Sequence, residues 1–396
     1  MNRMEAKEQR LSVLIFCPAA VGGIAEYTDY QAKALQQLGV NVVVLCSSGY
    51  LARRAVAYPV RHCLAEDGAA LPGSRLLRRV VKSGRIIYNQ WRFAWEVLRR
   101  RPSLALVACY AEYLSPFWFW PHLLLARGRN QLYGAILHDP VRDYQVGPAW
   151  WHHLSVCLAY LPLRFGTAHQ RMPAPSPIPT HVEVIETPHG VFDLTESLED
   201  PLEIRSRWQV PAGKKVFLAF GFIRDNKNLD LVLRALIDHP DAFLVVMGKT
   251  QSAKDRPVAF YLKLAEELGV SERTRFFDEF VPNEKLAIYF SAADFIVLTY
   301  SASFRSQSGV LNVAARARRP VLASAGPSPM EDSVKRFSLG IFVEPDSVSA
   351  LAEGIGVLLR DGIAEPRWDD YEAYASWQAN ARGLLDAVER LGKRRK

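Results

Sequence analysis

Two series of short apolar runs alternate with helix-like segments along this chain, and that alternation constrains the fold more than any other feature. In the first half the runs cover residues 11–17, 41–46, 103–110, 130–138 and 182–186. In the second half they cover residues 215–221, 242–248, 274–280, 295–300, 319–324 and 340–344. Continuous apolar runs separated by helices are typical of parallel strands joined by crossover helices. The sequence therefore predicts an α/β protein with two doubly wound parallel sheets.

The predicted domains divide where this pattern stops, between about 191 and 212, around Trp208 and Pro211. A length of 396 residues is enough for two separate cores. We expect a first domain over 1–195 and a second over 196–370. The remaining segment, 371–396, is expected to be a helix that returns to the first domain, followed by a basic tail.

Composition narrows the class of protein. Hydrophobic residues make up 49% of the chain and charged residues 23%, which is typical of a globular protein. The five cysteines are widely spaced, so neither a disulfide framework nor a zinc site is indicated. The first residues lack the apolar core of a signal peptide, and no apolar run reaches the roughly 18 residues of a membrane span. We therefore expect a cytoplasmic protein.

Glycines open the helix that follows the first apolar run. Gly22 and Gly23 allow backbone N–H groups to approach an anion at a helix N-terminus. A tight strand-to-helix turn also uses glycine for structural reasons, so both interpretations stay open. The segment does not match G-x-G-x-x-G, which argues against a dinucleotide fingerprint.

Two cations follow the first apolar run of the second half, in FGFIRDNKNLDLVLRAL. Arg224 and Lys227 precede a predicted helix whose N-terminus is already partly positive, so a bound anion would relieve their repulsion. A diphosphate is the natural candidate, and two solvated surface cations are the alternative. A third turn, with Ser308, Gly309 and Val310, offers an N-cap and free N–H groups at another helix start. Because parallel sheets bind ligands at the carboxyl ends of their strands, we expect one site in a cleft between the domains.

The chain resembles the retaining GT-B glycosyltransferases of the glycosyltransferase group 1 kind, which transfer sugars from nucleotide diphosphate donors. The segments that carry the resemblance are GGIAEYTDYQAKALQQLGVNVVVL, FGFIRDNKNLDLVLRA, FVPNEKLAIYFSAADFIVLTY and QSGVLNVAARARRPVLAS. Their R-x-x-K and Q-S-G-V signals are spaced as in the branch that acts in polysaccharide assembly. The resemblance implies a GT-B fold, in which two Rossmann-like domains face a central cleft.

The resemblance also implies roles for particular residues. Arg224 and Lys227 would grip the donor diphosphate, and His138, in LHDP, would lie near the transferred sugar. His189, in TPHGVF, matches an element at the domain junction, although a lone histidine is more often a packing residue. The residues implied to contact the nucleotide sugar are Gly22, Gly23, Val281, Ser308, Gly309 and Val310.

One departure from the family concerns two glutamates, eight positions apart, that many members use for the donor sugar and the ribose. Their positions hold Arg305 and Val313 here. The departure leaves the donor sugar, and the choice between UDP and GDP, open. It also keeps two alternatives open: an inert relative that only binds a nucleotide sugar or a partner, and a sugar-nucleotide epimerase.

No Asp-x-Asp occurs in the chain, so no paired-carboxylate magnesium site is indicated. We expect no metal and no cofactor beyond the nucleotide sugar as co-substrate. Protein cations would then stabilise the leaving diphosphate. The resemblance implies retention at the anomeric carbon, with a glycan or polyprenyl-linked acceptor.

Basic charge gathers in the first half, which holds 21 Lys and Arg against 12 Asp and Glu over residues 1–190. Within it, residues 75–101 carry nine Lys and Arg and the single acid Glu96, in an amphipathic helical pattern. We expect its apolar stripe (77, 80, 84, 87, 91, 94 and 98) to pack on the sheet. The outward cations would attract an anionic membrane at its inner face, with help from Trp118 and Trp120. No nucleic-acid motif is present, and no nucleic-acid partner is expected.

Overall fold

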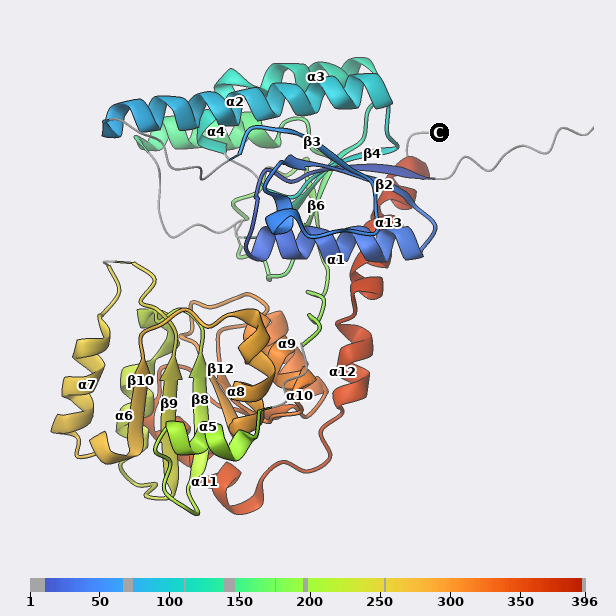
Figure 1. The fold of residues 1–396 in the computed structure, drawn as a ribbon. Helices are drawn as coiled ribbons and strands as arrows, with labels where there is room; N and C mark the ends of the chain where they lie inside the picture. The colour runs from blue at the N-terminus through green and yellow to red at the C-terminus, as the bar shows by residue number, and fades with distance from the viewer. Residues whose placement is uncertain are drawn as a thin grey trace, which may run out of the picture. The chain divides into compact units, whose positions relative to one another are not determined.

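The computed structural model describes residues 11–66, 74–109, 112–138, 147–174, 176–194, 199–252 and 254–393. The chain forms two compact units (Figure 1). The first comprises Met1–Thr187 with Trp377–Lys396, and the second comprises Pro188–Ser376. Each is described by itself.

The first unit is built on a seven-stranded parallel sheet in the order β3-β2-β1-β4-β5-β6-β7. Its strands are β1 (Ser12–Phe16), β2 (Asn41–Ser47), β3 (Val60–Leu64), β4 (Leu104–Val107), β5 (Tyr133–Leu137), β6 (Phe165–Ala168) and β7 (Glu183–Glu186). Its helices are α1 (Gly23–Gln37), η1 (Tyr50–Arg53), α2 (Arg75–Arg100), η2 (Glu112–Phe117), α3 (Phe119–Gly128), α4 (Ala149–Tyr160) and α13 (Trp377–Lys393). Helices α2, α3 and α4 cover one face of the sheet, and α1 and α13 lie on the other (Figure 1).

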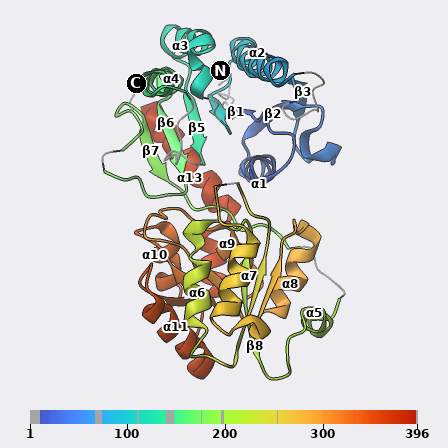
Figure 2. The ribbon, with the colours of Figure 1, turned by 90° about the vertical axis from the view of Figure 1, so that its left-hand side faces the viewer.

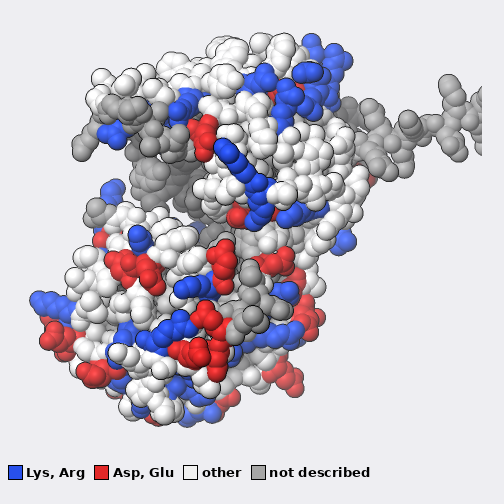
Figure 3. Space-filling model, viewed as in Figure 1, with Lys and Arg blue, Asp and Glu red and all other residues white. Residues whose placement is uncertain are grey.

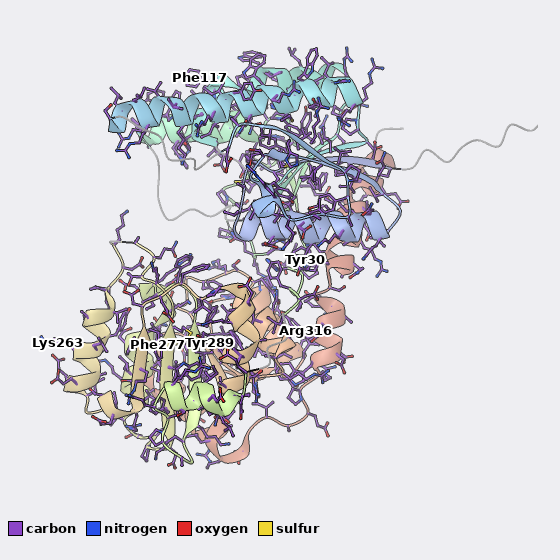
Figure 4. The ribbon with its side chains drawn as sticks, viewed as in Figure 1. Tyr30, Phe117, Lys263, Phe277, Tyr289 and Arg316 are labelled. Carbon is purple, nitrogen blue, oxygen red and sulfur yellow. The ribbon has the colours of Figure 1, made fainter. Side chains whose placement is uncertain are left out.

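Helix α13 docks on α1 through buried polar and aromatic contacts. Asn380 accepts a hydrogen bond from Gln31 Nε2 at 3.0 Å and donates one to Tyr27 OH at 2.8 Å. The Trp377 ring stacks on Tyr30, labelled in Figure 4, with centroids 5.3 Å apart. Helix α13 is therefore packed into the first unit through its buried side.

The second unit contains a six-stranded parallel sheet in the order β10-β9-β8-β11-β12-β13. Its strands are β8 (Lys215–Phe220), β9 (Ala242–Met247), β10 (Thr274–Phe277), β11 (Phe295–Thr299), β12 (Val321–Ser324) and β13 (Gly340–Phe342). Its helices are α5 (Pro201–Arg207), η3 (Asp225–Lys227), α6 (Leu229–Ala235), α7 (Val258–Glu267), η4 (Ser271–Arg273), η5 (Asn283–Lys285), α8 (Leu286–Ala292), α9 (Gly309–Arg316), α10 (Pro329–Arg336), α11 (Val348–Asp361) and α12 (Trp368–Tyr374). Residues of α6, α7 and α11 form the core on one face of the sheet, and those of α5, α8, α9, α10 and α12 form it on the other. Figure 2 draws α6 and α7 at the centre of this unit, with α11 on the left and α5 and α8 on the right.

The predicted pair of doubly wound parallel sheets is confirmed, because every predicted apolar run contains a strand. Two strands were not predicted, β3 and β6. The sequence of β3, VRHCL, mixes polar and apolar residues without a run, and β6, FGTA, is only four residues long and contains glycine. Both pair with strands that the pattern does identify.

The first unit ends at Thr187 and the second begins at Pro188, whereas the sequence pattern placed the domain boundary near residue 195. The reason is that the segment after β7 packs with the second unit: Val191 N donates to Ala375 O at 2.8 Å, and Leu194 packs on that unit's core. Helix α12 also belongs to the second unit, through buried Tyr371. Of the segment 371–396, the part from Trp377 lies in the first unit, and the basic tail at 394–396 lies outside the described residues.

The expected packing of helix α2 is wrong in part. Leu77, Val80 and Trp91, from the stripe expected to pack on the sheet, have exposed fractions of 51%, 60% and 51%. Ile87, Ala94 and Leu98 of the predicted stripe do pack on the core, where Phe93 and Val97, from a neighbouring side of the helix, join them.

Two residues expected on the outer side of α2 or on the surface are buried. Glu96 is fully buried because Arg61, Arg92 and Arg100 pair with its carboxylate at 3.0, 3.2 and 2.8 Å. Trp118 is also buried in the core, whereas Trp120 is exposed. Among the described helices, none combines the length and the apolar character that crossing a bilayer requires.

The docking of α13 predicts the effect of Asn380→Ala. The change removes the shorter of the two bonds of Gln31 Nε2 and leaves only the 3.5 Å contact with Tyr27 OH, and such a loss in a buried site typically costs about 1–3 kcal/mol of unfolding free energy. Urea denaturation of the full chain measures this loss. Gln378→Ala is the control, because Gln378 is exposed and its bond to Gln37 lies at the surface. Equal stability of the two variants would contradict the assigned contact.

Candidate functional site

The loops at the carboxyl edge of the second sheet bring the two predicted cations together. Arg224 and Lys227 lie in the loop that leads from β8 through η3 into α6. Lys227 Nζ donates to Phe220 O, the last carbonyl of β8, at 2.7 Å. Burial, followed by the charge of Arg224, lowers the pKa of Lys227 to about 7. The ammonium therefore lies in a site that disfavours positive charge unless an anion is present.

No carboxylate among the described residues neutralises either cation. Among the described residues, Arg224 and Lys227 form no ion pair, and the nearby Asp225 faces Arg256 at 3.9 Å. The positive charge of Arg224 contributes to lowering the pKa of Lys227, which lies three positions later in the same loop. Two close cations without a carboxylate form a site for a multiply charged anion.

The cation loop is held in place by the loop that follows β11. Thr299 Oγ1 donates to Lys227 O at 2.8 Å, and Ser301 N donates to Asn226 O at 2.9 Å. The Asp346 carboxylate accepts from Asn228 Nδ2 at 2.8 Å and from Ala302 N at 2.9 Å, so one side chain joins both loops. These bonds fix the backbone that carries Arg224 and Lys227.

Glycine at position 248 permits the close approach of two loops at this edge. Gly248 has φ +147°, and a Cβ there would lie 2.2 Å from Gly221 O. Gly221 in turn adjoins the cation site, because a Cβ on it would lie 3.4 Å from Lys227 Nζ and 3.8 Å from Val310 Cγ2. Lys227 and Val310 therefore meet beside Gly221.

The N-terminus of α9 is the third predicted anion-binding turn. Ser308 occupies the N-cap position, but its hydroxyl pairs with Tyr300 OH at 3.1 Å and makes no capping bond. Within the described part of the chain, no acceptor takes the N–H groups of Gly309 and Val310. Ser308 therefore occupies the expected N-cap position but does not make the expected capping hydrogen bond. The free N–H groups of Gly309 and Val310 favour an anion at this helix N-terminus.

A buried network behind α9 orients this turn. Gln307 Nε2 donates to Tyr371 OH at 2.8 Å, and Tyr371 OH donates to Asn312 Oδ1 at 2.6 Å. Asn312 Nδ2 contacts His189 Nδ1 at 3.2 Å. His189 therefore has a packing role within the second unit, where it supports the helix that follows the Q-S-G-V segment.

Val281 lines a pocket of about 200 Å³ at the ends of β8, β9 and β10. The pocket also includes Gly221, so it adjoins the cation site. Phe222 and Phe280 are its exposed aromatic residues, and Lys249 and Glu279 are its charged ones. Aromatic and apolar side chains with a few charged groups at the rim are typical of a pocket for a small organic ligand.

The remaining predicted residues lie in the first unit, at the carboxyl ends of its strands. Gly22 has φ +90° at the N-cap of α1, Gly23 begins that helix, and both are exposed with open space around them. His138 follows β5, and its ring meets the ring of Tyr27, in α1, edge-on at 5.0 Å. Burial lowers the pKa of His138 to about 4, so the imidazole is neutral near pH 7.

The two positions that hold glutamate in many relatives differ in environment. Arg305 is partly buried in the loop before α9 and forms no ion pair among the described residues. Val313 is buried in the core with an exposed fraction of 8%. A valine side chain there offers no hydrogen bond to a ligand.

Several supporting residues were not identified from sequence. Tyr300, Asp346 and Tyr371 contact the predicted turns, yet Asp346 and Tyr371 lie about 40 to 120 positions away along the chain from the residues they hold. Only Tyr300 adjoins a predicted motif, at the end of FIVLTY. Within the described ranges, no group of three or more His, Cys, Asp or Glu side chains is arranged to hold a metal ion. The absence of a metal remains a prediction.

Comparison with known proteins identifies relatives of the second unit. Residues 201–383 match the model of the family Glycosyl transferases group 1. D-inositol 3-phosphate glycosyltransferase of Nocardia farcinica is 28% identical over 200 residues, which is 48% of this chain and 43% of that relative. The chain therefore spans less than half the length of this curated relative.

Two solved structures match nearly the whole chain. A glycosyltransferase of Rickettsia africae matches with a TM-score of 0.69 and 15% identity, over 97% of this chain and 99% of that one. Alr3699/HepE of Anabaena, in complex with UDP and glucose, matches with a TM-score of 0.67 and 13% identity, over 96% and 100% of the chains. The chain has the GT-B fold, as predicted.

The contact between the two loops predicts the effect of Gly248→Ala. A methyl group cannot lie 2.2 Å from Gly221 O, so the loops after β8 and β9 must separate. Strain of this kind costs about 1–3 kcal/mol, which a shift in the thermal midpoint measures. Gly309→Ala is the matched control, because that position has open space and no positive φ. An unchanged midpoint for Gly248→Ala would contradict the close approach.

Proposed function

We propose that this protein is a glycosyltransferase that uses a nucleoside diphosphate sugar, and that the second unit binds the donor. The observation that carries the proposal is the pair Arg224 and Lys227, which no carboxylate of the described ranges neutralises, beside the free N–H groups of α9. The family match over 201–383 supports it. The complex of Alr3699/HepE with UDP and glucose supports this class of donor.

In this proposal each part of the donor has its own contacts in the second unit. Lys227 Nζ and Arg224 bind the diphosphate, together with the N–H groups of Gly309 and Val310. The nucleobase occupies the pocket lined by Val281, which adjoins the diphosphate site through Gly221. Val313 supplies no carboxylate for the ribose, so ribose contacts come from elsewhere.

The proposed chemistry follows from charge. When the bond between the anomeric carbon and the diphosphate oxygen breaks, negative charge develops on the diphosphate. Fixed cations and amides stabilise that charge without a metal ion. In a retaining, front-face reaction, the leaving phosphate oxygen takes the proton of the acceptor hydroxyl while the new bond forms on the same face.

The acceptor side of the reaction is assigned to the first unit. Neutral His138 is suited to hydrogen-bond the transferred sugar near pH 7, and it is not suited to act as a cation. The acceptor class is a glycan or a polyprenyl-linked sugar in cell-surface polysaccharide assembly. A lipid-linked acceptor places the protein in the cytoplasm, at the inner face of a membrane.

The proposal predicts that Arg224→Ala and Lys227→Ala each lower turnover by about 10²–10³-fold, because each removes a donor to the leaving group. Release of nucleoside diphosphate from a panel of UDP- and GDP-sugars measures turnover. Lys214→Ala is the control, because its ammonium pairs with Asp241 away from the site. Near-normal turnover in either site variant would refute the assignment.

The same assay separates the alternatives. Release of nucleoside diphosphate supports transfer chemistry, and addition of a chelator should leave its rate unchanged. Interconversion of the sugar without release would instead indicate an epimerase. Binding without either reaction would indicate an inert relative.

The lowered pKa of Lys227 predicts a pH dependence of donor binding. A bound diphosphate favours the charged amine, so it raises this pKa from about 7. Binding at pH 8 therefore takes up most of one proton, and affinity falls as the pH rises above 7. Calorimetry with UDP and GDP, in buffers of different ionisation enthalpy, measures the uptake.

Lys227→Gln should abolish this proton uptake, and Lys214→Gln should not change it. Undiminished uptake in the Lys227 variant would show that another group titrates on binding.

A further inference from the structure

The outer side of helices α2, α3 and α4 in the first unit exposes an unusual set of large apolar residues. We call this set the aromatic face. Its members are Tyr88, Trp91, Trp95, Phe117, Trp120, Leu124 and Trp150, with exposed fractions between 51% and 66%. Single exposed apolar residues are ordinary, but a group on neighbouring helices indicates a surface that is covered in use.

The aromatic face is continuous across the three helices. Trp91 Nε1, on α2, donates to Phe117 O at 3.2 Å. The Phe117 ring lies 6.2 Å from Trp151, which is 5.7 Å from Trp150 in α4. On α3, Trp120 packs on Phe119 at 4.6 Å. Figure 4 labels Phe117 within this layer of helices.

Helix α2 extends this face as a stripe. Leu77, Val80, Tyr88, Trp91 and Trp95 recur at spacings of three, four or eight residues, which places them on one side of the helix. All five are exposed by half or more. At 1.5 Å per residue the stripe is about 27 Å long. The stripe therefore runs along most of helix α2 and is not confined to one end of it.

Among the described residues of α2, α3 and α4, the exposed charged side chains are all positive, although the partly buried Glu66 lies beside Arg85 of α2. Within 74–109, 112–138 and 147–160, the acids are Glu96 and Glu112, and both are buried. The exposed cations are Arg78, Arg79, Lys82, Arg99, Arg100, Arg101, Arg127 and Arg129. They lie toward the two ends of α2 and the end of α3, and Figure 3 shows a largely uncharged surface between them. Cations around exposed tryptophan and tyrosine complement an anionic, partly apolar partner.

We propose that the aromatic face inserts into the headgroup region of an anionic lipid bilayer, with the cations at its ends bound to lipid phosphates. Tryptophan and tyrosine prefer this depth because their rings are apolar and their N–H and O–H groups reach water. This proposal deepens the membrane attachment proposed above. It differs from attraction by the α2 cations alone, because burial of aromatic side chains persists when salt screens charge.

The test uses the full chain and vesicles of phosphatidylcholine, alone or in equal mixture with phosphatidylglycerol. We expect binding to the anionic vesicles, with a blue shift of tryptophan emission and quenching by brominated acyl chains. Part of this binding should persist at about 0.5 M salt, where the Debye length is only a few ångströms.

The aromatic variant Trp91→Ala/Trp95→Ala/Trp120→Ala should bind anionic vesicles about tenfold more weakly or worse, and should lose the salt-resistant part. The matched control is Leu202→Ala/Ile237→Ala/Leu262→Ala, which removes similarly exposed apolar side chains from the second unit. It should bind like the unchanged protein. Because all these side chains are exposed, circular dichroism should show unchanged folding, and the single variant Trp95→Ala provides a milder check.

A variant that removes positive charges from α2 distinguishes insertion of the aromatic side chains from electrostatic attraction to the bilayer. Arg78→Gln/Arg79→Gln/Lys82→Gln should weaken binding at low salt and retain the salt-resistant part. Loss of that part in the charge variant, or unchanged binding of the aromatic variant, would overturn the proposal. Absence of vesicle binding, with self-association in ultracentrifugation that the aromatic substitutions abolish, would also overturn it and would assign the face to a second copy of the chain.

These outcomes are independent of the transfer reaction. Lys227→Ala should bind vesicles like the unchanged protein, since it lies in the donor site. The aromatic variant should still release nucleoside diphosphate from a donor in solution. Loss of vesicle binding would therefore contradict the membrane proposal, and loss of turnover would contradict the proposed donor site.

Discussion

Two cationic side chains held close together, with no counter-ion in the part of the chain that the structure describes, are the constraint on which the second unit depends. Lys227 keeps one hydrogen bond to the last carbonyl of β8, and its burial lowers its pKa to about 7. A protein built only for stability would pair such an amine with a carboxylate, because an uncompensated buried charge is costly. This unfavourable burial of an amine occurs at the carboxyl edge of a parallel sheet, where proteins with such folds bind their ligands.

Holding that pair requires support from distant parts of the chain. Asp346 joins the loops after β8 and β11, and Tyr371 links Gln307 to Asn312 behind α9. None of these side chains needs to touch a ligand. Their effect is to fix the backbone that presents the cations and the free N–H groups, and preorganised donors are the more effective ones.

In the first unit, helices α2, α3 and α4 both cover the sheet and form an exposed surface. The same layer that covers the sheet with Phe93 and Val97 presents tryptophan, tyrosine and phenylalanine to the outside. Glu96 is buried among three arginines, so no exposed acid among the described residues of this layer opposes an anionic surface. Helix α2 thus packs on the sheet through Phe93 and Val97 and exposes its aromatic residues on another side.

The sequence by itself determined the parallel sheets and the turns that bear Gly22, Arg224, Lys227 and Gly309. Apolar runs, glycines and cations act locally, so their pattern is visible along the chain. Only the tertiary structure decided which side of α2 is buried, that Ser308 bonds Tyr300 instead of capping α9, and that α13 completes the first unit. These outcomes depend on contacts between residues far apart in the chain, and spacing within one helix or loop carries no information about such contacts.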